Sequence, residues 1–82
     1  MNQTKIASGV GSIAALKIAL LDRAIAESER FTQAARAAIR ELNDPRTPAA
    51  GYGGPSRKVA AARRASMDAS AALTAFRRGR NV

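Results

Sequence analysis

The chain has 82 residues, of which 14 are lysine or arginine and 6 are aspartate or glutamate, so its formal net charge is +8. It contains no cysteine and no histidine, which excludes disulfides and removes the residue types that serve most often as general bases, thiol nucleophiles and soft-metal ligands. We therefore expect a single small non-enzymatic domain, without metal or cofactor, that gains stability by association with other molecules.

The N-terminal segment does not have the pattern of a targeting signal. Residues 1–21 contain Lys5 and Lys17 and no acid, but Lys17 interrupts the apolar core that a signal peptide needs. No run of about 18 uninterrupted apolar residues is present for a membrane span. We expect a protein that is not secreted through a signal peptide and that works in the cytoplasm or inside a virion or another assembly.

Helix breakers divide the chain into two helices and a loop. All three prolines and three of the six glycines lie within residues 43–55. The first helix is predicted over residues 12–42 with Ser12 as its N-cap, and the second over residues 56–78 with Ser56 as its N-cap and Gly79 as its left-handed stop. The predicted fold class is all-α: one domain, residues 1–82, formed by an antiparallel helical hairpin with a Pro/Gly-rich loop and a basic tail at residues 79–82.

Apolar and small residues recur at alternating steps of three and four in both helices, which is the heptad spacing of a coiled coil. In the first helix they are Ile18, Leu21, Ile25, Ser28, Thr32, Ala35, Ile39 and Leu42, and in the second they are Val59, Ala62, Ser66, Ala69, Leu73 and Phe76. An antiparallel register that places Leu42 beside Val59 also places Ile25 beside Phe76. We expect these two series to form the contact between the helices, although alanine is so abundant that chance spacing is the alternative.

The first helix is predicted to be longer than the second, about 46 Å against about 33 Å, so residues 12–24 extend past it. Apolar residues spread around much of this segment, and an exposed surface of this kind marks an interaction site. We expect it to contact another copy or a larger protein assembly through Ile13, Leu16, Ile18, Leu20 and Leu21. Two alternatives stay open: residues 1–10 fold back over the segment, or the helix lies on a membrane surface. Tyr52 in the loop is either an anchor in a partner's pocket or a cap over the hairpin end.

Positive charge is concentrated in the last third of the chain. Five cations balance five acids within residues 12–44, whereas seven cations face the single acid Asp68 within residues 56–82, a formal charge of +6. We expect all seven to bind a polyanion: Arg57, Lys58, Arg63, Arg64, Arg77, Arg78 and Arg80. Cations at a helix C-terminus suit the helix dipole, but Arg57 and Lys58 occupy the first turn, where the dipole opposes them. This unfavourable placement indicates a partner whose negative charge compensates it. The alternative is that the cations only keep the surface solvated and the protein soluble.

The expected function is that of a small basic structural or assembly protein, which docks through its first helix and presents its second helix and tail to a polyanion. Nucleic acid is the simplest polyanion, bound through phosphates without sequence specificity. A virion structural component or a nucleoid-type packaging protein fits this division, since small Ala/Arg-rich chains without cysteine are common among phage virion proteins. The alternatives are a protein-binding adaptor or inhibitor whose arginines meet an acidic protein surface, or a helical-hairpin filament subunit. No small-molecule substrate is expected.

Overall fold

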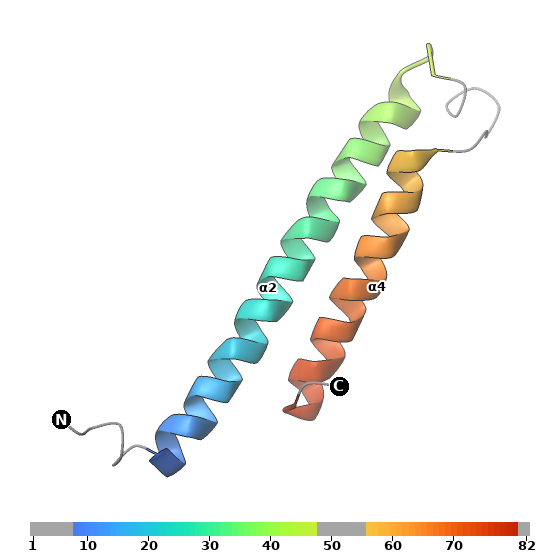
Figure 1. Cartoon of the computed structure of the whole chain (residues 1–82). Helices are drawn as coiled ribbons and strands as arrows, with labels where there is room; N and C mark the ends of the chain where they lie inside the picture. The colour runs from blue at the N-terminus through green and yellow to red at the C-terminus, as the bar shows by residue number, and fades with distance from the viewer. Residues whose placement is uncertain (1–7, 48–55, 81–82) are drawn as a thin grey trace.

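The chain forms a two-helix hairpin in a computed structural model, which describes the backbone of residues 8–47 and 56–80 and the side chains of residues 13–47 and 56–80. Within these ranges, helix α2 covers Ser8–Asn43 and helix α4 covers Arg57–Arg78. The two helices lie side by side and run in opposite directions (Figure 1). The predicted all-α antiparallel hairpin is therefore confirmed.

Local chemistry explains where α4 begins and ends. Ser56 has an extended backbone (φ −131°, ψ 121°), and its Oγ accepts the N–H of Val59 at 3.1 Å. The same hydroxyl donates to the carboxylate of Glu41, so it ties the start of α4 to the end of α2. Gly79 has a φ of 76°, and its N–H donates to the carbonyl oxygens of Ala75 and Phe76. Both predicted caps of the second helix are present.

Helix α2 is longer than predicted at both ends. It begins at Ser8, so Ser12, the predicted N-cap, lies inside the helix. Serine and glycine in a first turn each cost only ~0.5–1 kcal/mol relative to alanine, a cost that the strong helix formers behind them can carry. The helix ends at Asn43 because Pro45 cannot continue the hydrogen-bond ladder, and the hydroxyl of Thr47 donates to the carbonyl oxygen of Glu41 at 2.8 Å.

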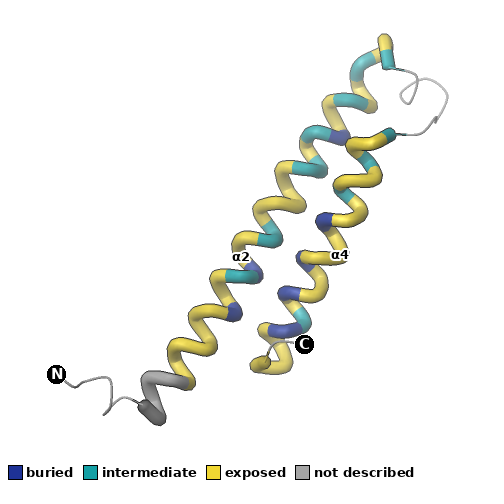
Figure 2. Tube along the Cα trace, in the orientation of Figure 1, coloured by how far each residue is buried: buried dark blue, intermediate teal, exposed yellow. Residues whose placement is uncertain are grey.

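The helices meet along alanines and not along the predicted heptad series. The buried residues are Leu20, Ala24 and Ala38 on α2 and Ala65, Ala69, Ala72 and Ala75 on α4, and they lie where the two helices face each other (Figure 2). In both helices the buried series is offset by one residue from the predicted one. Leu20 is 2% exposed whereas Leu21 is 42% exposed, and Ala72 is fully buried whereas Leu73 is 40% exposed. Of the predicted contact residues only Ala69 is buried, whereas Ser28, Ala35, Val59 and Ala62 are half-buried and the others are exposed. The prediction was therefore wrong for the large residues.

The alanine contact buries fewer polar groups than the predicted contact would. The predicted series would bury the hydroxyls of Ser28, Thr32 and Ser66 in the middle of the hairpin, where a polar group without a partner is unfavourable. Turned by one residue, the helices bury the methyl groups of Ala65 and Ala69 there. The polar atom that the observed contact does cover is Oε1 of Glu27, which accepts no hydrogen bond from the described residues and lies 3.4 Å from the guanidinium of Arg30. The hydroxyls stay at the edge, where that of Thr32 donates to the carbonyl oxygen of Ser28 at 3.0 Å.

The hairpin is one helix thick. Its principal extents are 61 × 22 × 13 Å, and α2 continues past the C-terminal end of α4 (Figure 1). A single layer of two helices covers only the line where the helices touch. Within residues 13–47 and 56–80 nothing covers the two broad faces of the hairpin, and eleven large apolar side chains of these ranges are at least 37% exposed.

Candidate protein and polyanion interfaces

One broad face of the hairpin carries charges that cross between the helices. The guanidinium of Arg30 lies 3.4 Å from the carboxylate of Glu27 on its own helix and 3.3 Å from that of Asp68 on α4. The Arg30 and Asp68 side chains are 60% and 51% exposed, so water screens this pair and it adds at most a few tenths of a kcal/mol. We call this side of the molecule the ion-paired face.

The opposite side carries a continuous apolar surface with charges only along its edges, and we call it the apolar face. It consists of Ile18, Leu21, Ile25, Ser28, Thr32, Ala35, Ile39 and Leu42 of α2 together with Val59, Ser66, Leu73 and Phe76 of α4. Residues seven apart share one side of a supercoiled helix, so these residues form continuous rows. All of them belong to the series predicted to join the helices. The structure brings them together, but on the surface beside the contact.

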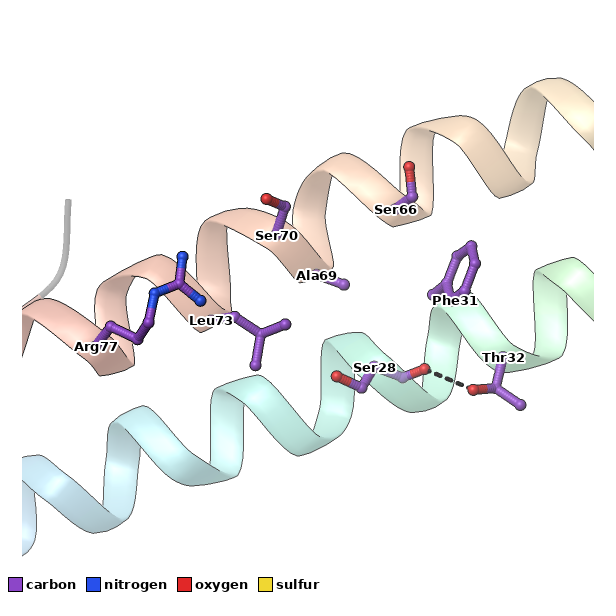
Figure 3. Close-up of a pocket in the computed structure, with 8 residues that line it drawn as sticks. All are labelled: Ser28, Phe31, Thr32, Ser66, Ala69, Ser70, Leu73 and Arg77. Atoms are coloured by element: carbon purple, nitrogen blue, oxygen red, sulfur yellow. Dashed lines mark hydrogen bonds between the residues drawn. The ribbon is translucent and has the colours of Figure 1, made fainter.

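Two adjoining grooves run between the helices on the apolar face. The first is lined by Leu21, Ala24, Ile25, Ser28, Glu29, Leu73 and Phe76. The second is lined by Ser28, Phe31, Thr32, Ser66, Ala69, Ser70, Leu73 and Arg77 (Figure 3). Because Ser28 and Leu73 line both, the grooves form one continuous depression. Their volumes of about 350 and 330 Å³ lie at the lower limit of small-molecule pockets, and their open side suits an elongated partner better than an enclosed ligand.

The residues predicted to dock on a partner fall into three groups. Ile18 and Leu21 belong to the apolar face, and Ile13 and Leu16 lie on the part of α2 beyond α4; all four are between 41% and 59% exposed. Leu20 is buried inside the hairpin, because it faces the last turns of α4, and it is therefore not part of an exposed docking surface. Tyr52 lies outside the described residues.

Sequence reasoning missed part of this surface. Ile25, Ile39, Leu42, Leu73 and Phe76 were assigned to the contact between the helices, yet each is at least 40% exposed. The sequence did hold a signal, because a second heptad series runs beside the first on both helices. It includes Ala65, Ala72 and Ala75 on α4, and on α2 it mixes Ala24, Ala34 and Ala38 with Leu20, Glu27, Phe31 and Glu41. Alanine satisfies so many templates that this series could not be preferred from spacing alone.

All seven cations predicted to bind a polyanion are exposed. Arg57, Arg64 and Arg78 are separated by multiples of seven and form one row along α4. Arg63 and Arg77 form a second row at the edge of the apolar face, where Arg77 lines the groove and donates to the hydroxyl of Thr74 at 3.2 Å. Lys58 lies in the first turn of α4, and Arg80 follows its C-cap.

These cations keep their charge uncompensated within the hairpin. Asp68 is the one acid of α4, and it pairs with Arg30 of α2. Across residues 13–47 and 56–80, no ion pair involves any of the seven. The first turn of α4 itself contains no acid, but the carboxylate of Glu41 on α2 accepts the hydroxyl of the N-cap Ser56 and so offsets part of the dipole penalty on Arg57 and Lys58. The back of α4 therefore presents a region of unbalanced positive charge.

The described residues contain neither a metal-ligand cluster nor a membrane-spanning helix. Among the described residues, no three aspartate or glutamate side chains come together as metal ligands. Neither of the described helices is long and apolar enough to cross a membrane. Comparisons with protein-family models, with curated proteins and with solved structures give no match.

Proposed function

We propose that this protein is a non-enzymatic assembly component that docks through exposed apolar residues of α2 and presents the cations of α4 and its tail to a polyanion, most simply nucleic acid. The observation that carries the polyanion part is the set of seven exposed cations without an ion-pair partner in the described ranges. Helix α4 is about 33 Å long, close to one turn of duplex DNA at about 34 Å. Cations near its two ends can therefore reach phosphates about one helical repeat apart.

Binding of this kind is driven by counterion release and depends little on sequence. If five of the cations contact phosphate, the logarithm of the binding constant falls with the logarithm of salt concentration with a slope of about −4.5. The measurement is fluorescence anisotropy of a labelled duplex between 50 and 200 mM salt, repeated with an unrelated duplex of equal length. We expect equal affinities and equal slopes for the two duplexes.

A matched pair of variants separates the rows on α4 from net charge. Replacing Arg57 and Arg64 with glutamine removes two cations of α4, and replacing Lys17 and Arg40 with glutamine removes two exposed cations of α2. Both changes lower the net charge equally. We expect the α4 variant to reduce the slope by about 1.8 and the α2 variant to leave it almost unchanged. Equal effects of the two variants would show that only net charge matters.

Absence of any duplex binding at 50 mM salt would remove nucleic acid as the partner. The remaining explanation of the unbalanced cations would then be an acidic protein surface, as in an adaptor or inhibitor. Arginine suits that partner equally well, because its planar guanidinium forms two parallel hydrogen bonds with a carboxylate as readily as with a phosphate.

A further inference from the structure

We infer that the apolar face is covered by the apolar face of a second copy of this chain, turned end for end, so that two hairpins form an antiparallel four-helix bundle. This inference names the partner for the docking part of the proposed function. Its tests use no polyanion and change none of the seven cations of α4 and its tail. A result that contradicts one of the two proposals therefore leaves the other standing.

The size of the apolar face matches what a stable dimer needs. Its seven large side chains, which are Ile18, Leu21, Ile25, Ile39, Leu42, Leu73 and Phe76, are between 40% and 59% exposed. Together they leave roughly 700 Å² open per chain, so a symmetric pair would bury ~1,400 Å², within the range of ~1,200–2,000 Å² for specific interfaces. The contact inside the hairpin is poorer, since it buries a single leucine and otherwise alanines.

The order of side-chain sizes along the face is nearly the same read in either direction. On α2, large residues at positions 18, 21 and 25 and at 39 and 42 flank small residues at 28, 32 and 35. On α4, Val59 at one end and Leu73 and Phe76 at the other flank Ala62, Ser66 and Ala69. A two-fold axis that turns a copy end for end needs such a pattern, because each patch must match itself.

The centres of the two patterns lie at the same level of the hairpin. The centre on α2 falls between Ser28 and Thr32, and the centre on α4 falls between Ser66 and Ala69; all four residues line one groove (Figure 3). The contact between Arg30 and Asp68 on the opposite face marks the same level. A single two-fold axis can therefore relate both helices to their copies. Two unrelated patterns would have no reason to share one centre.

Around this axis these residues face partner residues of similar size. Ile18 meets the partner's Leu42, Leu21 meets the partner's Ile39, and Ser28 meets the partner's Thr32. Phe31 extends from α2 towards α4 in the middle of the groove (Figure 3), only one position from the axis. The small residues around it leave room for the ring of the partner's Phe31, and paired aromatic rings are favourable beyond the area they bury.

Charges at the edge of the apolar face favour the inverted arrangement over a parallel one. Asp22, Glu29 and Arg36 are spaced by seven and form the outer edge of α2, and Glu29 lines the groove. In the inverted dimer Asp22 lies opposite the partner's Arg36 twice, and Glu29 lies once, near the axis, opposite the partner's Glu29. A parallel copy would place Arg36 opposite the partner's Arg63 twice, and these repulsive contacts would cancel the two attractive contacts between Asp22 and the partner's Arg77. The inverted dimer sets the two α4 helices side by side, and at 0.15 M salt their cations are screened beyond about 8 Å.

Disulfide trapping tests the register directly, because the chain has no cysteine of its own. Chains carrying Leu21→Cys and chains carrying Ile39→Cys are mixed and oxidised at 0.15 M salt. In the inverted dimer, position 21 faces position 39 of the partner, whereas two copies of position 21 are about 27 Å apart, beyond the reach of a disulfide. We expect rapid mixed disulfides and slow or no homodisulfides, with Gln33→Cys, exposed away from the face, as the unreactive control. Homodisulfides that form as fast as mixed ones, or no cross-linking, would overturn the inverted dimer.

A charge exchange supplies a second test that a folding defect cannot imitate. Within one chain Asp22 and Arg36 are about 21 Å apart, so they interact only in the dimer. We expect Asp22→Arg and Arg36→Asp each to raise the dimer dissociation constant by sedimentation equilibrium on the order of 5- to 10-fold, and the double variant to restore it. A double variant that is no better than the single variants, or a parent chain that stays monomeric at high micromolar concentration, would refute the proposal.

Discussion

Replacing Ala72 with leucine tests the alanine contact between the helices. Ala72 is 0% exposed, and its neighbours along the contact, Ala69 and Ala75, are 8% and 0% exposed. A leucine side chain at this position has no solvent-filled gap to enter. It must separate the helices or adopt a strained rotamer, which costs about 1–3 kcal/mol in a packed contact.

The position next to it provides the control. Ala71 is exposed on the same turn of α4, so Ala71→Leu makes the same chemical change with the same small effect on helix propensity. Exposed substitutions of this kind usually change the stability by no more than about 0.5 kcal/mol. Any larger difference between the two variants reports the packing at position 72.

The measurement is thermal and urea unfolding followed by circular dichroism at 222 nm, at one protein concentration for all variants. For a domain of this length, 1 kcal/mol corresponds to roughly 4–8 °C in Tm. We therefore expect Ala72→Leu to lower the Tm by roughly 5–20 °C, and Ala71→Leu to change it by only a few degrees. Equal effects, or a higher Tm for Ala72→Leu, would refute the alanine contact, because leucine gains stability only where it fills space or covers apolar surface.

Three further outcomes follow from the ends of the helices. Ser56→Ala removes both the cap of α4 and the hydrogen bond to Glu41, and we expect a loss of about 1–2 kcal/mol in urea unfolding; an unchanged midpoint would contradict the cap. Gly79→Ala places a side chain at a φ of 76°, so we expect about 1 kcal/mol of destabilisation, although nothing lies within 4 Å of the added methyl group. Hydrogen bonds from the side chain of Arg46 and, to a smaller extent, from its backbone N–H hold the pKa of Asp44 below its ordinary value of 3.8. Arg46→Ala should raise that pKa in an NMR titration. Any stability from this contact is present above pH 3.8 and is lost as the pH falls through the lowered pKa.

The exposed apolar face and the exposed cations lie on neighbouring sides of α4. In the inverted dimer, the two α4 helices lie beside each other, and their cations occupy one side of the bundle. The proposed interface between copies would then double the surface offered to a polyanion. Counter-charge from that polyanion would in turn relieve the repulsion between the two α4 helices.

The sequence by itself determined the two helices, the start and end of the second, and their antiparallel arrangement. Each of these depends on chemistry within a few residues of the chain. Ser56 caps α4, Gly79 adopts the left-handed conformation that stops it, and Pro45 prevents α2 from continuing. The uneven charge was equally readable, since residues 56–82 contain a single acid against seven cations.

Only the tertiary structure decided which side of each helix faces the other. Both helices carry two adjacent heptad series. One has large residues and hydroxyls, and the other is mainly alanine on α4 but mixes alanine with leucine, phenylalanine and glutamate on α2. Either series satisfies the spacing of a coiled coil. The choice depends on how closely two backbones can approach and on which groups lose water between them, and these quantities exist only when both helices are present. The choice between the two series placed Leu20 inside the hairpin and left Leu21 on its surface. The resulting rotation of each helix by one residue creates the apolar face.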